Sequence, residues 1–255
     1  MLSSYNKFLN TYNDGLKELK QLGIDLDTVE SVSRLGISKY KVLTDAFYNC
    51  FDKNTIYIKR YKKVSTGNPV VMNRIFKIIS DMFSAMLLML HFSAGGSYRL
   101  FEMSYFNMDN LGTIMKLYQP DDGKAYLHIV SAYSKNKKLE PRVLLVNDEV
   151  TKYFIHYILA LYPLKYDAMK DLPLDSSVND YKNISNDVEI GIDDNLQELI
   201  ESSRLNTATD LLQRFVFAVP FMKNKEYFAS RMVTPILKEL LKAEVGRRGG
   251  AINLK

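Results

Sequence analysis

The chain has 255 residues, of which 47% are hydrophobic and 25% are charged, and its formal net charge is +5. These are the proportions of an ordinary folded protein, so they exclude a disordered chain, a collagen-like repeat and a small disulfide scaffold. A chain of this length can form one large domain or a large and a small one. We divide it into an N-terminal helical region with a strand, 1–64, and a larger helical and β-hairpin domain, 65–255.

The N-terminal third is predicted to be mainly helical. Apolar residues repeat at helical spacing over 4–21, which predicts an amphipathic helix. A second helix is predicted over 38–51, and alternating polarity predicts a strand over 55–61. Asn68 followed by Pro69 is typical of a helix start. We therefore expect a long helix over 69–94, which the glycines that follow it bring to an end.

The middle of the chain predicts a β-hairpin. Segments 125–133 and 142–146 are rich in strand-forming residues, and the connection between them is basic. Asp148 is expected to cap a helix that ends near Tyr162-Pro163. Further helices are predicted over 97–109, 193–204, from 207 or 209 to 219, where Pro220 ends the helix, and over 235–245. The predicted fold class is therefore α+β, mainly helical with a small antiparallel sheet.

Segment 171–203 differs from the rest of the chain in charge. It holds nine acidic residues and one lysine, a net charge of −8, so the remaining residues carry +13. One interpretation is a solvated loop followed by a helix. The other is an acidic insert that binds a partner or masks a basic face.

Several kinds of site are not expected. Cys50 is the only cysteine, so neither a disulfide within the chain nor a cysteine zinc site is expected. His91, His128 and His156 lack metal-binding spacing and are expected to be packed or partly exposed. The chain contains neither of the common glycine-rich phosphate loops. We expect no cofactor and no metal.

The sequence also bears on location. Residues 1–7 lack a charged head followed by an apolar run, so no signal peptide is expected. The most apolar stretch, 82–98, has 17 residues without a formal charge, fewer than the roughly 20 that a membrane-spanning helix needs. We interpret it as a buried core helix running into a turn, and expect no membrane partner. The predicted location is intracellular, in the cytoplasm, nucleoid or nucleus, or a virion if the chain is viral.

Two segments together resemble the catalytic core of tyrosine recombinases and phage-type integrases. The first follows the apolar residues 87–90 with a glycine turn, Arg99, Glu102 and, further on, Asp109. The second is the hairpin with Lys135 in its turn and Arg142 after it. That family has these features in the same order, and the lysine of its hairpin reaches the DNA. The partial resemblance covers roughly 69–235 and implies a recombinase-like core.

The resemblance also implies site residues. In this family two arginines clamp the scissile phosphate and stabilise its transition state. A lysine protonates the leaving 5′ oxygen, and a tyrosine near the C-terminus forms a phosphotyrosine intermediate. By the resemblance, Arg99 is the first arginine and Arg214 the nearest counterpart of the second. Lys135 is the lysine, with Lys137 or Lys138 as substitutes.

The second half departs from the family pattern. The family has His-x-x-Arg at the start of a late helix, whereas 210–214 reads Asp-Leu-Leu-Gln-Arg and lacks the histidine. No tyrosine follows Tyr227, which lies only 13 residues beyond Arg214. We therefore expect the active site to be degenerate rather than intact.

Three functions follow from these observations. The first is a non-catalytic protein whose basic residues neutralise the phosphates of DNA or RNA. The second is a structural or assembly protein of a viral or phage particle, in which charged surfaces guide contacts with other proteins or with further copies of the chain. The third, an active DNA strand-transfer enzyme, ranks last because catalytic groups are missing. The candidate nucleic-acid-binding residues are Lys59, Arg60, Lys62, Lys63, Arg99, Lys135, Lys137, Lys138, Arg142, Arg247 and Arg248.

Overall fold

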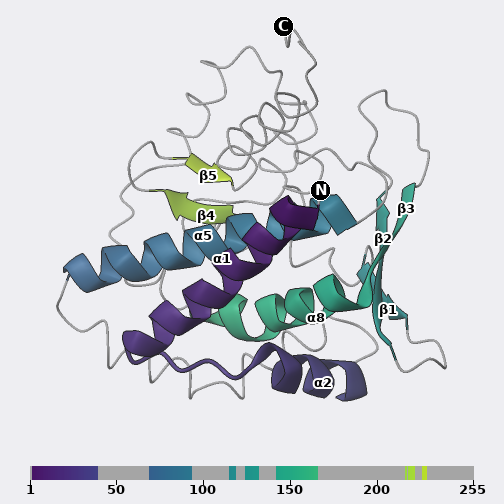
Figure 1. Cartoon of the computed structure of the whole chain (residues 1–255), viewed down its shortest axis with the longest axis horizontal. Helices are drawn as coiled ribbons and strands as arrows, with labels where there is room; N and C mark the ends of the chain where they lie inside the picture. The colour runs from purple at the N-terminus through teal and green to yellow at the C-terminus, as the bar shows by residue number, and fades with distance from the viewer. Residues whose placement is uncertain are drawn as a thin grey trace, which may run out of the picture.

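The structure is a computed structural model that describes residues 2–39, 69–93, 115–118, 124–131, 142–165, 216, 218–221 and 226–228. Figure 1 shows that this part of the chain is mostly helical, with a small sheet at one side. The sheet has three antiparallel strands, and a separate pair of short strands lies nearby. The predicted class, α+β with a small antiparallel sheet, is confirmed for the described residues.

The described elements follow one another in a simple order. The helices are α1 (Leu2–Gln21), α2 (Val29–Lys39), α5 (Pro69–Ser93) and α8 (Asp148–His156), and α8 continues into the π-helical turn η1 (Tyr157–Leu161). The strands are β1 (Met115–Tyr118), β2 (Tyr126–Ser131), β3 (Arg142–Val146), β4 (Ala218–Phe221) and β5 (Glu226–Phe228).

Helix α5 is the centre of the core. Every residue from 78 to 90 except Asp81 is buried, so the helix is enclosed on nearly all sides. Its segment Asn73–Ser93 also has the length and composition of a membrane span, but 78% of its most apolar window is buried inside the protein. A helix that is apolar all round needs other elements to cover it. Residues 82–90 therefore form the buried core helix that the sequence predicts.

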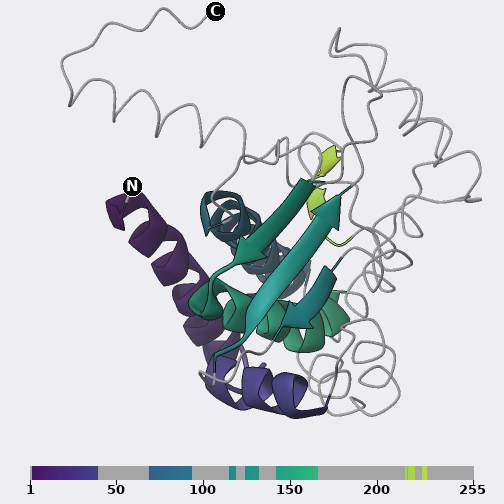
Figure 2. The same cartoon turned by 90° about the vertical axis from the view of Figure 1, so that its right-hand side faces the viewer.

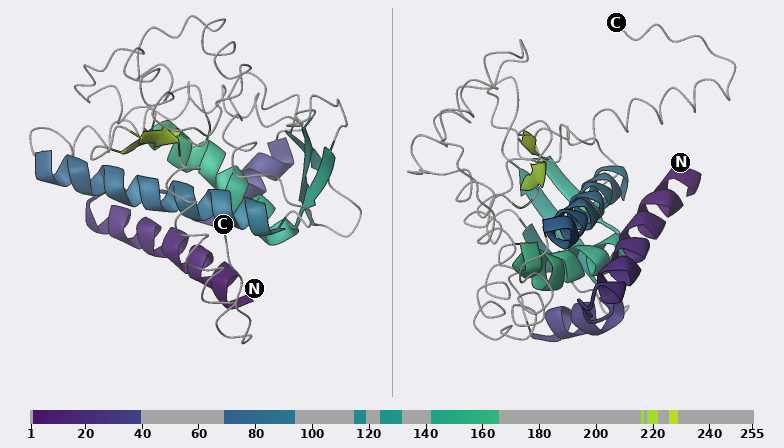
Figure 3. Two further views of the ribbon diagram at one scale, coloured as in Figure 1. Left: turned by 90° about the horizontal axis from the view of Figure 1, so that it is seen from above. Right: turned by 90° about the vertical axis from the view of Figure 1, so that its left-hand side faces the viewer.

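Helix α1 lies alongside α5 (Figure 3), and contacts at the two ends of the pair show that the helices run antiparallel. Near one end the rings of Phe8 and Phe92 stack with their centroids 5.9 Å apart. Near the other end Arg74 and Glu18 form an ion pair at 3.5 Å. Between them Gly15 allows the two helices to approach closely, because a Cβ atom there would lie 2.4 Å from Met82 Cγ.

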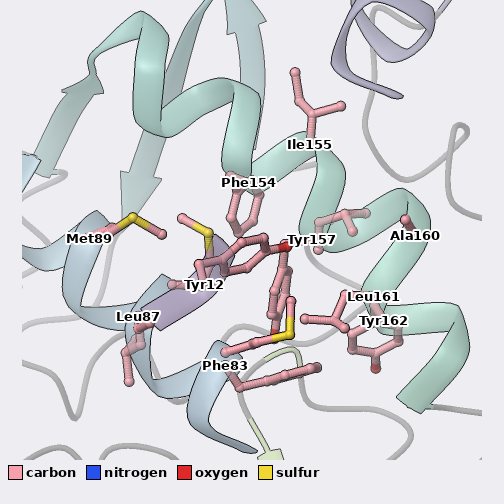
Figure 4. Packing of buried hydrophobic residues seen from close by; sticks show 14 of the residues in the cluster. Tyr12, Phe83, Leu87, Met89, Phe154, Ile155, Tyr157, Ala160, Leu161 and Tyr162 are labelled. Atoms are coloured by element: carbon pink, nitrogen blue, oxygen red, sulfur yellow. The ribbon is translucent and has the colours of Figure 1, made fainter. Parts of the chain in front are cut away.

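Helix α8 and the turn η1 cover another side of α5. Figure 4 shows the rings of Phe83, Phe154 and Tyr157 gathered between α5 and α8. Phe83 and Tyr157 meet edge to face with their centroids 4.5 Å apart, the geometry that aromatic rings prefer. The Tyr157 hydroxyl donates to the backbone carbonyl of Val216, so the buried hydroxyl has an acceptor.

The sheet packs on α8 through one of its faces. The strand order is β1-β2-β3, with both neighbouring pairs antiparallel. Side chains alternate across a strand, and the buried set is Met115, Leu127, Ile129 and Val146. Figure 2 shows the sheet in front of α8, with its other face toward the viewer. The sheet thus has one face in the core and one face open.

Several predicted elements are confirmed. The helix expected over 4–21 is α1, and the helix expected over 69–94 is α5, which begins at Pro69. The two predicted strands are β2 and β3, and they pair antiparallel as a hairpin. The division of the chain at 64/65 stays a prediction, since those residues lie outside the described part.

Of the helix predicted over 38–51, only residues 38 and 39 are described; they are helical, but the helix that contains them begins before 38. Residues 38 and 39 are the last two of α2, which begins at Val29. The hydroxyl of Thr28 accepts a hydrogen bond from the Ser31 N–H at 3.2 Å. Such a side chain satisfies an amide that a helix start leaves without a partner, so Thr28 sets the earlier start.

The prediction that Asp148 caps α8 is also wrong. Asn147 is the cap: its backbone is extended, and its side-chain oxygen accepts from the Val150 N–H at 2.9 Å. The helix does not end near Pro163 either, because helical backbone continues to Lys165. A proline clashes with the carbonyl four residues before it, and the wide π-turn η1 before Pro163 relaxes that geometry.

The helix predicted to reach Val219 is wrong at its C-terminal end. Residues 218–221 form β4, which pairs with β5 with a register shift between Ala218 and Phe221. Pro220 fits a short strand of this kind, since proline is tolerated at edges and irregular positions of a sheet. The strand expected over 55–61, the helices over 97–109, 193–204 and 235–245 and the acidic insert lie outside the described residues.

The contact at Gly15 predicts a double-mutant result. Gly15→Ala should destabilise the protein by about 1–2 kcal/mol, because the added methyl overpacks the site against Met82. In a Met82→Ala background the same change should instead stabilise it by up to about 1 kcal/mol, because alanine favours a helix over glycine. Urea unfolding followed by circular dichroism measures both. Equal effects in the two backgrounds would contradict the contact.

Candidate nucleic-acid interface

The open face of the three-stranded sheet carries exposed aromatic and basic side chains. Register places Tyr118 of β1 opposite Tyr126 of β2. In the next row Lys116 is opposite His128, and His128 is opposite Leu145 of β3. We call these five residues the open face. Tyr118 is 58% exposed and Leu145 is 53% exposed.

Such exposure is unusual within the described part of the chain. There, large hydrophobic side chains are exposed at Val70, Tyr118 and Leu145. Two of these three lie on the open face, whereas the opposite face of the same strands is buried at Met115, Leu127, Ile129 and Val146 and half-buried at Leu117. A cluster of exposed apolar groups is a candidate interaction surface, whereas single exposed residues are ordinary.

The charge of the open face is positive. Lys116 is exposed on β1, and Lys124, also exposed, lies two residues before β2. Within its described residues the face carries no acidic side chain. Asp121 and Asp122 lie between β1 and β2 in the sequence, outside the described residues. Among the described residues the nearest carboxylate in sequence is Asp148, which follows β3 and accepts hydrogen bonds from the Ala125 N–H and the Lys152 ammonium.

Helix α8 holds the sheet from behind. The Thr151 hydroxyl accepts from the Leu127 N–H at 2.9 Å and donates to the Val146 carbonyl at 3.3 Å. Leu127 and Val146 face each other across β2 and β3. One buried hydroxyl therefore ties both strands to the helix and positions the open face.

Asp148 adds a second tie between α8 and the sheet. Partial burial disfavours its charged form, but hydrogen bonds from Lys152 and from the Ala125 N–H outweigh this and lower the pKa of the carboxyl below its usual value. The carboxylate lies in the first turn of α8, where a negative charge also favours the helix dipole. The positive charges of Lys152 and Lys124 lower the pKa further, so Asp148 offsets part of the charge of Lys124.

The predicted basic tip belongs to the β2–β3 hairpin. Ser131 pairs with Arg142, so the connection 132–141 leaves and re-enters the sheet at neighbouring strand ends. This connection carries Lys135, Lys137 and Lys138. Arg142 is the first residue of β3. The other predicted site residues lie outside the described part of the chain: Lys59, Arg60, Lys62, Lys63, Arg99, Lys135, Lys137, Lys138, Arg214, Arg247 and Arg248.

Sequence reasoning missed the open face. Clusters of basic residues along the chain do not reveal it, because Lys116 and His128 become neighbours only through strand pairing. A signal was present, because outward and inward residues alternate over 126–129. The four residues of β1 are too few to show that alternation, so the partner strand was not predicted.

The predicted role of the histidines as packed or partly exposed residues is confirmed. His91 and His128 are partly exposed, and His156 is fully buried. The Tyr12 hydroxyl lies 2.9 Å from His156 Nδ1, and His156 Nε2 lies 2.9 Å from the Asp27 carbonyl. The carbonyl can only accept, so the neutral ring donates from Nε2 and accepts at Nδ1. Within the described residues no three acidic, histidine or cysteine side chains form a metal-binding group.

A buried lysine lies at the end of the same helical segment. Lys165 is fully buried, and its Nζ lies 4.9 Å from the Phe83 ring centroid and 4.7 Å from that of Tyr162. Burial lowers the pKa of this amine. Aromatic faces attract a cation at such distances, so the two rings offset part of the cost of burial. The amine belongs to the core and is not accessible to a polyanion.

Comparisons with protein families, with curated proteins and with solved structures give no match to this chain.

The buried His156 predicts a loss of stability in mild acid. Burial lowers the pKa of His156 to about 4, against the opposing effects of the Asp27 carbonyl and of the Asp27 and Glu30 charges. In the unfolded chain this histidine has its ordinary pKa of 6.5. Between pH 4 and 6.5 the unfolded state therefore binds more protons than the folded state does. The free energy of unfolding is therefore unaffected by this group above pH 6.5. It falls as the pH drops from 6.5 to 4, by about 3 kcal/mol in all.

Urea unfolding at several pH values measures this dependence. His156→Gln should show a weaker decline between pH 6.5 and 4 than the unmodified protein. Equal slopes for the two proteins would contradict the buried, neutral histidine.

Proposed function

We propose that this chain is a nucleic-acid-binding protein with a degenerate tyrosine-recombinase-like core, which binds without cutting. The observation that carries the proposal is the β2–β3 hairpin beside the open face. Its connection holds three lysines within four residues, and the adjoining sheet face adds Lys116 and Lys124 without an acidic side chain among its described residues. Phosphates are neutralised by such clusters of lysine and arginine.

Strand pairing supports this use of the hairpin. The ladder between β2 and β3 extends from Leu127–Val146 to Ser131–Arg142. Thr151 and Asp148 tie this ladder to α8, so the two strands that the lysine-bearing connection joins are held in place. Phosphate contacts from a rigid element position a nucleic acid but carry no sequence information. We therefore expect binding that varies little with sequence.

The order of elements also supports the recombinase-like part of the proposal. The long apolar helix α5 precedes the segment with Arg99, and the hairpin with Lys135 in its connection follows. The resemblance places these features in the same order. Catalysis is not proposed, because 210–214 lacks the histidine and no tyrosine follows Tyr227. Without these groups neither the phosphate clamp nor the nucleophile is complete.

Replacement of the hairpin lysines tests the proposal. Alanine at Lys135, Lys137 and Lys138 should weaken binding to DNA or RNA about equally for all sequences and reduce the salt dependence. Each lost phosphate contact removes about 0.9 from the slope of log affinity against log salt for a DNA duplex and about 0.7 for a single strand. Fluorescence anisotropy with labelled oligonucleotides between about 50 and 200 mM salt measures both quantities.

A charge-matched control separates local contacts from net charge. Lys7, Lys17 and Lys20 are exposed on α1, so their replacement by alanine removes the same charge elsewhere. This control should retain most of the binding and of the slope. An equal loss in both triple variants would contradict a hairpin site. A covalent, denaturant-resistant adduct with nicked DNA would contradict the absence of catalysis.

The assembly function is the outcome to expect if no binding occurs. Absence of retention on DNA and RNA at about 50 mM salt, where phosphate contacts are strong, would contradict the proposed function. The basic residues would then be candidates for contacts with acidic protein surfaces, of which 171–203 is one by its charge.

A further inference from the structure

We infer that the open face binds single-stranded nucleic acid by stacking unpaired bases on Tyr118 and Tyr126. This inference rests on the proposed function and names the form of the ligand. It goes beyond the hairpin lysines, which contact phosphate and do not distinguish a duplex from a single strand.

The arrangement of the two tyrosines is the first reason. They are directly opposite each other on β1 and β2, where facing Cβ atoms lie about 4.5–5.5 Å apart. Tyr118 is 58% exposed, and Tyr126 is half-buried. Together they form an aromatic surface at one end of the face. Every base has a π-face, so such a surface stacks unpaired bases with little regard to sequence.

The neighbouring row supplies the charge. Lys116 is two residues from Tyr118 on the same strand and therefore on the same face. Lys124 lies two residues before Tyr126 and is exposed. A tyrosine pair flanked by two lysines, without an acidic side chain among the described residues of the face, matches a strand of bases joined by phosphates. An acidic peptide supplies negative charge, but only a nucleic acid supplies a flat aromatic base with each phosphate.

A single strand fits better than a duplex for a geometric reason. In a duplex the flat faces of the bases are stacked on one another and only their edges reach the grooves. A flat sheet therefore meets phosphates and sugars of a duplex, whereas it meets the bases of a single strand. The exposed Tyr118 and Leu145 gain contacts only in the second case.

Anisotropy with a labelled oligothymidylate of about 12 nucleotides, within the usual site size for such surfaces, tests the inference. Tyr118→Ala should weaken binding by about 5-fold to 150-fold, the range for loss of one stacked base. Tyr118→Phe keeps the ring and should bind almost as the unmodified protein does. Val70→Ala, at the end of α5 farther from the sheet in Figure 1, removes another exposed apolar side chain and should have no effect.

Parallel titrations distinguish the forms of nucleic acid. A titration with an oligouridylate of the same length shows whether DNA and RNA strands bind alike. In a third titration, Tyr118→Ala should reduce the affinity for a duplex of the same length only slightly. Polyglutamate serves as a competitor that carries charge but no bases. Effective competition at equal charge would contradict stacking, because charge alone would then suffice.

The outcomes separate this inference from the proposed function. Binding that responds to the hairpin lysines but not to Tyr118→Ala would overturn stacking and leave the proposed function in place. Absence of all binding would overturn both. Circular dichroism and the urea midpoint show whether each variant is folded. Because Tyr118 is exposed, its replacement should cost little stability.

Discussion

The burial of α5 is the constraint on which the rest of the described structure depends. From Ile78 to Leu90 this helix presents apolar side chains in almost every direction. It cannot be stable with a side exposed to water, so other elements must surround it. Helix α1 covers one side and the segment α8–η1 another. The close approach at Gly15 and the aromatic contacts of Tyr157 are local consequences of that enclosure.

This enclosure explains why the sheet has an open face. Helix α8 contacts both α5 and β2, so it lies between the core helix and the sheet. The sheet buries Leu127, Ile129 and Val146 on the side toward the core. Its other side has no part in enclosing α5 and is free to carry exposed side chains. That Tyr118 and Leu145 occur there, beside lysines, is therefore a feature of the surface and not a requirement of the core.

Much of this fold is predictable from sequence, because long elements show their periodicity. The apolar repeat of α1, the continuous apolar run of α5 and the β-rich segments of the hairpin each span enough residues to be recognised. Short or local features were not recognised. The four residues of β1 are too few to show a period. The N-cap of α8 is Asn147 rather than the predicted Asp148, because the Asn147 side chain accepts a hydrogen bond from the Val150 N–H. The sequence predicts that Pro220 ends a helix, although it lies within β4.

The candidate site was less predictable for a different reason. The basic connection of the hairpin is visible as a run of lysines, but the open face exists only once register is known. Lys116, His128 and Leu145 come from three strands, and no local pattern links them. The resemblance to recombinases directs attention to Arg99, Lys135 and Arg214. The surface of the described residues adds an aromatic and basic face that the resemblance does not include.

The central claim is that nucleic acid contacts the open face of the sheet and its hairpin. Photo-crosslinking with an oligonucleotide containing 4-thiothymidine, followed by mass spectrometry of tryptic peptides, tests it most directly. The account predicts adducts on the peptides that contain Tyr118 and Tyr126 and on those from the connection 132–141. Adducts found only on peptides from α1, or from the C-terminal residues that include Arg247 and Arg248, would contradict it.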